Sequence, residues 1–209
     1  ASFTGYGRLM RFREKLPRLR RKKKRIAVVH LEGPVVECRG QMMRGGRMIA
    51  SDDVVPALDA LAESKAVKGV VLAVNSPGGS ALASDLIARS VHALADKKPV
   101  VAVFGNVAAS GGYYISALAH EVWTHPASVT GSIGVVGGKV VLGGALSRLG
   151  VQTTWMGPAP DPGLLTPEAK FTDGQRERFR GSLKRVYDRF IAIVSKGRSM
   201  EISEVEPVA

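Results

Sequence analysis

A serine among very small residues stands near the middle of the chain, in the stretch Ala108-Ala109-Ser110-Gly111-Gly112. The apolar, β-branched run 99–104 before it predicts a buried strand, and helical periodicity begins at Ala108. Ser110 is therefore expected where a strand meets the first turn of a helix, beside unpaired amides and the positive end of the helix dipole. That position suits a nucleophile, because developing negative charge is stabilised there, but it also suits a helix cap.

A second stretch with chemical potential is Asn75-Ser76-Pro77-Gly78-Gly79-Ser80, which closes the preceding strand. Its Pro-Gly pair predicts a turn, and two glycines without side chains leave amides open to a ligand, as in an oxyanion hole or an ordinary βα turn. Successive turns of neighbouring parallel strands meet at one edge of a sheet. We therefore expect Gly78, Gly79 and Ser110 to face one cavity.

Other catalytic classes fit the sequence poorly. The stretch 133–140 lacks the glycine and hydroxyl residues of a phosphate-binding loop, and 120–125 has one residue too many for a zinc-protease motif. The single cysteine, Cys38, excludes an internal disulfide and a cysteine-based zinc site. The candidate bases for Ser110 include His30, His92, His120 and His125. His125 is the strongest of them, whereas His30 and His92 fit structural roles better. No metal or cofactor is expected.

Strands and helices alternate along the chain, which predicts an α/β fold with a largely parallel sheet. Helices are predicted over 81–95, over 140–149 and over 173–196, and Ser51-Asp52-Asp53 is expected to cap another. The inward face of the first is expected to carry Leu82, Leu86, Ile87, Val91 and Leu94. The remaining predicted elements are strands at 26–31, 67–74, 99–104, 121–124 and 151–156, a strand edge at 130–135, and loops at 35–50 and 157–169.

Charge divides the chain into a basic arm, residues 1–25, and one nearly neutral domain, residues 26–209. The net charge is +12, and the segment from Arg8 to Arg25, with 11 Lys or Arg and one acid, carries +10 of it. Residues 8–25 could contact an anionic membrane surface or form a solvated linker, and nucleic acid is a weaker expectation. No run of about 18 apolar residues predicts a membrane span.

Four motifs, in order, resemble those of the signal peptide peptidase A (SppA) family, which is related in fold to the ClpP protease and to crotonases. The resemblance covers about residues 26–209 and rests on the motifs beginning at Asn75, Ala108, Thr130 and Leu149. It implies a ClpP/crotonase-like α/β fold and a serine endopeptidase with a Ser/Lys dyad, acting on extended apolar peptides such as cleaved signal peptides. It further implies a ring-like homo-oligomer at the bacterial inner membrane.

The same resemblance assigns roles to individual residues. Ser110 falls on the nucleophile and Ser132 on a serine that assists the lysine. Gly78 and Gly79, together with Gly111, fall on the oxyanion and substrate-binding elements.

The general-base lysine is missing from the position where short family members carry it. The loop 157–167 contains no lysine, and only Lys170 and Lys139 remain as weak candidates. The stretch 187–198 resembles the second repeat of the long members, in which the lysine comes from the first repeat. This chain is therefore expected to supply the serine half of a longer protease and to be poorly active alone. An inactive scaffold of the same fold and a crotonase-type acyl-thioester enzyme are the alternatives.

Overall fold

A computed structural model describes residues 24–38, 47–153 and 163–209. Most of the basic arm, residues 1–23, lies outside them, as do 154–156 of one predicted strand. The described elements are β1 (Arg25–Glu32), β2 (Val35–Val36), β3 (Ile49–Ala50), α2 (Ser51–Glu63), β4 (Val67–Ser76), α3 (Ala81–Ala95), β5 (Val100–Ala109), α4 (Gly111–Tyr114), β6 (Glu121–Trp123), β7 (Val129–Gly131), α5 (Gly143–Arg148), α6 (Asp173–Arg198), α7 (Ile202–Val205) and a 3₁₀ turn (Glu206–Val208).

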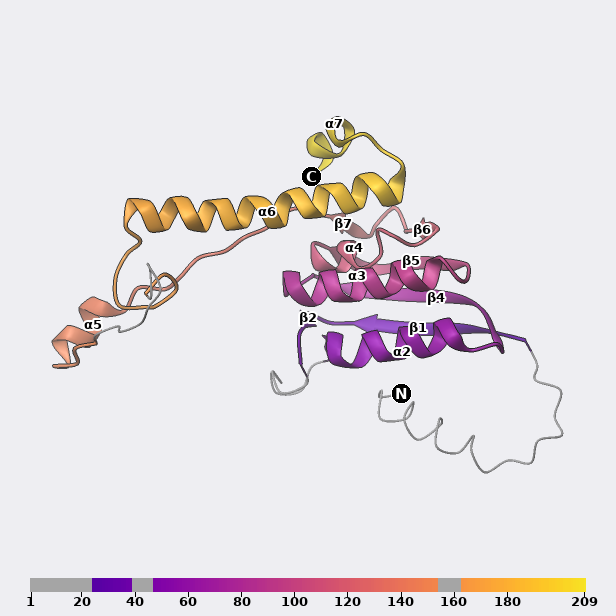
Figure 1. The fold of residues 1–209 in the computed structure, drawn as a ribbon, viewed down its shortest axis with the longest axis horizontal. Helices are drawn as coiled ribbons and strands as arrows, with labels where there is room; N and C mark the ends of the chain where they lie inside the picture. The colour runs from indigo at the N-terminus through magenta and orange to yellow at the C-terminus, as the bar shows by residue number, and fades with distance from the viewer. Residues whose placement is uncertain (1–23, 39–46, 154–162) are drawn as a thin grey trace, which may run out of the picture.

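The central sheet is parallel throughout, as the alternation of strands and helices predicts. Its strand order is β1-β4-β5-β6, with β7 pairing with the second half of β5 (Figure 1). The main core lies on one face of these strands and includes the fully buried Leu31, Leu72 and Ala102. Because β4 and β5 are parallel neighbours, the turns that follow them emerge at the same sheet edge.

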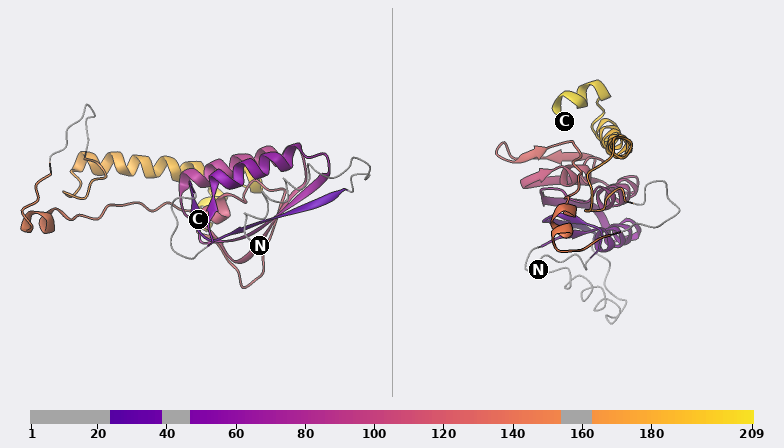
Figure 2. Two further views of the ribbon diagram at one scale, coloured as in Figure 1. Left: turned by 90° about the horizontal axis from the view of Figure 1, so that it is seen from below. Right: turned by 90° about the vertical axis from the view of Figure 1, so that its left-hand side faces the viewer.

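Helices α2 and α3 cover that core face (Figure 2). The bounds predicted for α3 are correct, and so are Ile87, Val91 and Leu94 on its inward face, which are buried, whereas Leu82 and Leu86 are exposed. At the beginning of α3 the small residues Ala83 and Ser84 occupy the buried side in place of the two leucines. The expected cap of α2 is also wrong, since that helix begins at Ser51 with no side-chain capping bond.

The opposite face of the sheet is open and apolar in the described structure. Ile26 and Val28 of β1, Val103 of β5 and Trp123 of β6 are 70%, 49%, 42% and 62% exposed. Parallel sheets are normally covered on both faces, because their strands are apolar on both sides. We call these four residues the open face.

Residues 132–153, residues 163–172 and the first half of α6 form an arm that extends away from the sheet (Figure 1). The helix predicted over 140–149 is shortened to α5, the strand edge predicted at 130–135 is limited to β7, and 151–153 are not a strand. Val136, Val140 and Leu149 on this arm are 100%, 71% and 77% exposed. Their apolar pattern is typical of packed elements, but the described chain places no core beside them.

Helix α6 begins with a capping box between Thr172 and Gln175 and packs its second half against α4. Its buried residues, among them Phe190 and Val194, form a second core with Tyr114. In length and apolarity, no helix in the described ranges reaches what a bilayer crossing requires.

Gly197→Ala is expected to loosen α6 from the domain. A Cβ at Gly197 would lie 1.8 Å from the Ala117 carbonyl oxygen, and backbone is not free to move aside. Overpacking of this kind costs about 1–3 kcal/mol, measurable as a lower unfolding midpoint in thermal denaturation. Gly181→Ala in the same helix is the matched control, because its Cβ would meet only the end of Arg185, at 3.7 Å. That change should stabilise the helix by roughly 0.5–1 kcal/mol; equal effects of the two substitutions would contradict the packing described here.

Candidate active site

Ser110 lies between β5 and α4 with an unusual backbone conformation, φ 50° and ψ −121°. Such a conformation is uncommon for a residue with a side chain and persists only where the surroundings enforce it. Here the Ser110 amide donates to the Gly131 carbonyl at 2.9 Å, and the Tyr114 amide donates to the Ser110 carbonyl at 2.9 Å. The serine side chain is partly exposed and makes no capping bond to α4, so it does not act as a helix cap.

Gly78 and Gly79 form the turn between β4 and α3. Gly78 has φ +98°, which favours glycine, and a Cβ at Gly79 would lie 2.1 Å from the Val35 carbonyl oxygen. Strand β2 holds this turn in place: the Val35 amide donates to Gly78 O at 2.9 Å, and the Ser80 amide donates to Val35 O at 2.8 Å. The loop predicted over 35–50 therefore contains a strand that shapes the glycine turn.

The glycine turn and the Ser110 turn are in direct contact. A Cβ at Gly78 would lie 2.7 Å from the Gly111 nitrogen and 2.8 Å from the Ser110 Cβ, and a Cβ at Gly111 would lie 3.1 Å from the Gly79 nitrogen. No side chain fits between the two turns. The structure thus brings together Gly78, Gly79, Gly111 and Ser110, as the parallel neighbouring strands predict.

The amides of these glycines differ in their hydrogen bonding. The Gly78 amide donates to the buried Ser76 hydroxyl at 3.1 Å. Among the described residues, no oxygen accepts a hydrogen bond from the amide of Gly79 or Gly111. Gly111 is also the first residue of α4, where an N–H has no partner within the helix. Two unused donors therefore lie beside Ser110.

Ser132 follows β7 directly and is exposed, with φ 48°. In the ladder between β5 and β7, Ala109 pairs with Gly131. Ser110 and Ser132 are thus the next residues of two neighbouring strands, which run about 5 Å apart. The structure brings Ser132 beside Ser110.

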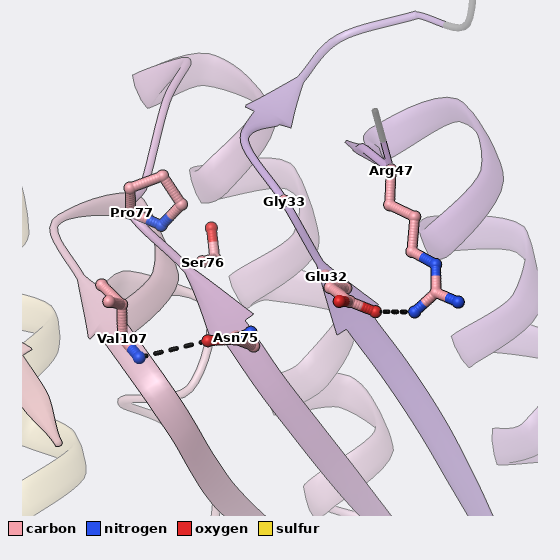
Figure 3. Close-up of a pocket in the computed structure, with 7 residues that line it drawn as sticks. All are labelled: Glu32, Gly33, Arg47, Asn75, Ser76, Pro77 and Val107. Carbon is pink, nitrogen blue, oxygen red and sulfur yellow. Dashed lines mark hydrogen bonds and ion pairs between the residues drawn. The ribbon is translucent and has the colours of Figure 1, made fainter. Parts of the chain in front are cut away.

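A hollow of about 400 Å³ opens at the carboxyl ends of β1, β4 and β5 (Figure 3). Asn75 forms part of its wall, and its side-chain oxygen accepts a hydrogen bond from the Val107 amide at 3.1 Å. The pairing of β4 with β5 changes register at this point, so Asn75 replaces a missing ladder bond. Glu32 and Arg47 form an ion pair at the rim, and Pro77 and Val107 supply apolar lining.

Asp85 on α3 connects three helices near Ser110, and no sequence motif indicates it. Its Oδ1 accepts hydrogen bonds from the Tyr114 hydroxyl of α4 at 2.8 Å and from the Arg189 Nε of α6 at 3.1 Å. Its Oδ2 accepts from the Arg89 Nε at 2.6 Å. Partial burial acts to raise the pKa of Asp85, but the hydrogen bonds from Tyr114, Arg189 and Arg89 outweigh burial and lower it. Burial and then the Asp85 carboxylate raise the pKa of Tyr114, which stays a hydroxyl donor.

The Asp85 cluster is expected to lose its stabilising effect in acid. Because the pKa of Asp85 is lower in the folded chain than the value of about 3.9 in an unfolded chain, its contribution is present above that value and is lost as pH falls through the folded pKa. Asp85→Asn should therefore reduce the drop in unfolding free energy between neutral pH and about pH 3, measured by urea denaturation. Asp96→Asn, at the exposed end of the same helix, is the control and should retain the full drop.

The lysine candidates are not brought to Ser110. Lys139 stacks over Phe171 at 4.4 Å, and Lys170 and Phe171 directly precede Thr172, the N-cap of α6. Phe190 of α6 contacts Tyr114, with the ring centroids 4.6 Å apart. Because a helix rises 1.5 Å per residue, Phe190 lies about 25 Å from the first residue of α6, and the two lysines are therefore far from the Ser110 turn.

The candidate histidine bases do not meet Ser110 either. The His125 Nδ1 accepts from the Ala127 amide in the turn before β7, and the His120 Nδ1 accepts from the Val100 amide at the far end of β5. His30 is exposed on β1, and His92 contacts Lys196 on the outside of α3. Within the described residues, no group of three His, Cys, Asp or Glu side chains is placed to hold a metal ion.

Known proteins resemble this chain in sequence and in fold. The sequence profile of peptidase family S49 matches residues 92–209. The chain is 31% identical over 185 residues to "Serine protease SPPA, chloroplastic" of Arabidopsis thaliana and 30% identical over 188 residues to "Protease 4" of Haemophilus influenzae, and it aligns over 88% of its length with each. A relative from Enterococcus faecium is 31% identical over 187 residues, or 89% of this chain.

The matched region is only part of these relatives. The chain covers 27% of the Arabidopsis protein, 29% of the Haemophilus protein and 54% of the Enterococcus protein. In structure, a point mutant of ClpP1 from Listeria monocytogenes aligns with 86% of this chain and 77% of its own, with a TM-score of 0.53 and 15% identity. The fold is therefore α/β and ClpP-like.

Proposed function

Because the chain belongs to peptidase family S49, we propose that the full-length protein hydrolyses peptide bonds with Ser110 as its nucleophile. The observation that carries this proposal is the contact between the strained Ser110 turn and the Gly78-Gly79 turn, with the unused amides of Gly79 and Gly111 beside the serine. A partly exposed hydroxyl next to preorganised donors is the arrangement that acyl transfer requires.

In the proposed reaction, the Ser110 oxygen bonds to the carbonyl carbon of the peptide while its proton passes to a neutral lysine amine. The oxyanion of the tetrahedral intermediate accepts hydrogen bonds from the amides of Gly79 and Gly111. The Gly78 amide holds the shape of the turn through Ser76. The C–N bond then breaks, the leaving amine takes the proton from the lysine, and water hydrolyses the resulting ester by the reverse proton path.

The base is proposed to come from outside the described chain, either from another part of the full-length protein or from a second copy. A lysine acts as a base only when burial or nearby positive charge lowers its pKa from about 10.4 toward neutrality. Lys139 and Lys170 lie beside the beginning of α6, far along this helix from its contact with Tyr114. The chain spans less than a third of its Arabidopsis and Haemophilus relatives. Ser132, beside Ser110, would hold the incoming amine in line.

We propose extended apolar peptides as substrates, with cleaved signal peptides as the physiological class. An extended peptide can add to a sheet as a further strand while its side chains enter neighbouring pockets. The short strand β7 lies next to Ser110, and the hollow of Figure 3 offers the apolar surfaces of Pro77 and Val107.

A ring-like homo-oligomer at a membrane is the proposed setting. The ClpP-like fold and the exposed valines and leucine of the arm support assembly with further copies. The basic residues 8–25 support contact with an anionic bilayer. Deleting residues 1–25 should weaken sedimentation of the full-length protein with anionic vesicles; unchanged sedimentation would make this segment a linker only.

Covalent labelling tests the proposed activity. The full-length protein is incubated with a fluorophosphonate probe, digested and mapped by mass spectrometry. Label on the peptide that contains Ser110 is the expected result. Absence of label would favour an inactive scaffold, and thioester turnover that persists in Ser110→Ala would favour a crotonase-type enzyme.

A further inference from the structure

From the three-helix contact at one carboxylate, we infer that Asp85, with Tyr114 and Arg189, is a set of positioning residues that fixes the Ser110 turn relative to the glycine turn. The inference rests on the proposed function, in that the aligned groups are the nucleophile and its oxyanion donors.

Helix α4 needs support from outside itself. It has only four residues, and a single turn of helix is not stable alone. Its first residue supplies the Gly111 amide, and its last residue is Tyr114. Among the described residues, the Tyr114 hydroxyl makes the only side-chain hydrogen bond from α4 to another helix.

The acceptor of that bond belongs to the element that carries the glycine turn. Ser80 caps α3 directly after Gly79, and its side chain accepts from the Ala83 amide at 3.2 Å. Asp85 follows little more than one turn later on the same helix. The Tyr114–Asp85 hydrogen bond therefore joins the element that carries Ser110 and Gly111 to the element that follows the Gly79 amide.

Helix α6 enters the same contact. Arg189 donates to the carboxylate oxygen that Tyr114 uses, and Phe190, the next residue, packs on the Tyr114 ring. The outer half of α6 belongs to the arm. The position of this helix is therefore coupled through Asp85 to the turn that carries Ser110.

Arg89 is not included in the positioning set. It contacts the other carboxylate oxygen, is 65% exposed at its side chain and lies on the same helix as Asp85, four residues later. Its removal leaves the bonds from Tyr114 and Arg189 intact, which makes it a matched control.

The test uses the full-length protein and two measurements. The first is the rate of fluorophosphonate labelling at Ser110, and the second is hydrogen–deuterium exchange in the peptide spanning 110–117. Tyr114→Phe keeps the ring on Phe190 and removes only the hydroxyl. It should slow labelling by about tenfold to a hundredfold, the scale of a misplaced reacting group, and speed exchange at 110–117.

Comparison variants separate positioning from general stability. Asp85→Ala should slow labelling at Ser110 as much as Tyr114→Phe does. Asp85→Asn should recover part of the labelling rate, because its amide oxygen still accepts a hydrogen bond from Tyr114. The labelling rate of Arg89→Ala should remain within twofold of that of the unchanged protein. Phe190→Leu, which loosens the same core without touching the polar contact, sets the effect of destabilisation alone. All labelling rates are measured at a temperature well below the lowest thermal unfolding midpoint among these variants.

The outcomes are distinct. Labelling and exchange in Tyr114→Phe within twofold of the unchanged protein, or no slower labelling than in Phe190→Leu, would overturn the inference. If the unchanged protein is not labelled at Ser110, the proposed function fails. Exchange at 110–117 in Tyr114→Phe then decides the positioning contact by itself, and unchanged exchange would overturn it.

Discussion

Ser110→Ala is expected to lower kcat/KM of the full-length protein on a peptide substrate by at least about a thousandfold, because the bond-forming oxygen is removed. The substitution deletes one atom from a partly exposed side chain that makes no capping bond, so the fold should be unchanged. Rates of cleavage of a fluorogenic apolar peptide provide the measurement, with circular dichroism to verify folding.

Substitutions of two other serines show whether the loss of peptide cleavage is specific to Ser110. Ser132→Ala should lower kcat by a smaller factor, about tenfold to a hundredfold, since an assisting hydroxyl orients the base without forming the bond. Ser203→Ala, at an exposed position on α7, should have no effect. Peptide cleavage that survives Ser110→Ala at an unchanged rate would refute the proposed nucleophile.

Gly78→Ala is expected to abolish activity by a different route, with a loss of at least about a hundredfold. A methyl group at Gly78 would lie 2.7 Å from the Gly111 nitrogen and 2.8 Å from the Ser110 Cβ, so the two turns must separate. The left-handed backbone at φ +98° adds strain of about 1–2 kcal/mol. Peptide cleavage and thermal unfolding should therefore both be impaired.

Gly150→Ala is the control that separates the effect of backbone strain at a positive φ from the effect of steric overlap between the two turns. Gly150 shares a positive φ, +73°, but a Cβ there would meet nothing within 4 Å. It should cost about 1 kcal/mol of stability and leave cleavage unchanged. If Gly78→Ala behaves in the same way, the contact between the two turns is not required for activity.

The elements that carry the site were predictable because their sequence signals are local. An apolar run ends at a proline-glycine pair before α3, and another ends at a serine between small residues before α4. Parallel neighbouring strands then place both turns at one edge. Gly78, Gly79 and Ser110 are therefore found together, as predicted from spacing alone.

The supporting contacts were not predictable, because they join residues distant in sequence without a pattern. Val35 holds the glycine turn from a short strand inside a region that resembles a loop. Asp85 has the sequence appearance of a surface residue of α3, and only the approach of α4 and α6 makes it a shared acceptor.

Packing partners account for the errors on the arm and on α3. Apolar periodicity indicates which side of a segment will be buried, but not against what. Leu82 and Leu86 satisfy the period of a helix as Ile87, Val91 and Leu94 do, yet only the last three are buried. Val140 and Leu149 satisfy it as well, on an arm that extends from the domain.

The open face carries a tryptophan whose intrinsic fluorescence can report whether that face is covered. Trp123 is 62% exposed there, so its indole is solvated in the isolated chain and should emit at long wavelength. Anything that covers the face would move its emission to shorter wavelength and protect it from quenching by acrylamide. In a Trp155→Phe variant of residues 1–209, Trp123 is the remaining tryptophan, so fluorescence followed against concentration would report whether this side of the sheet becomes dry.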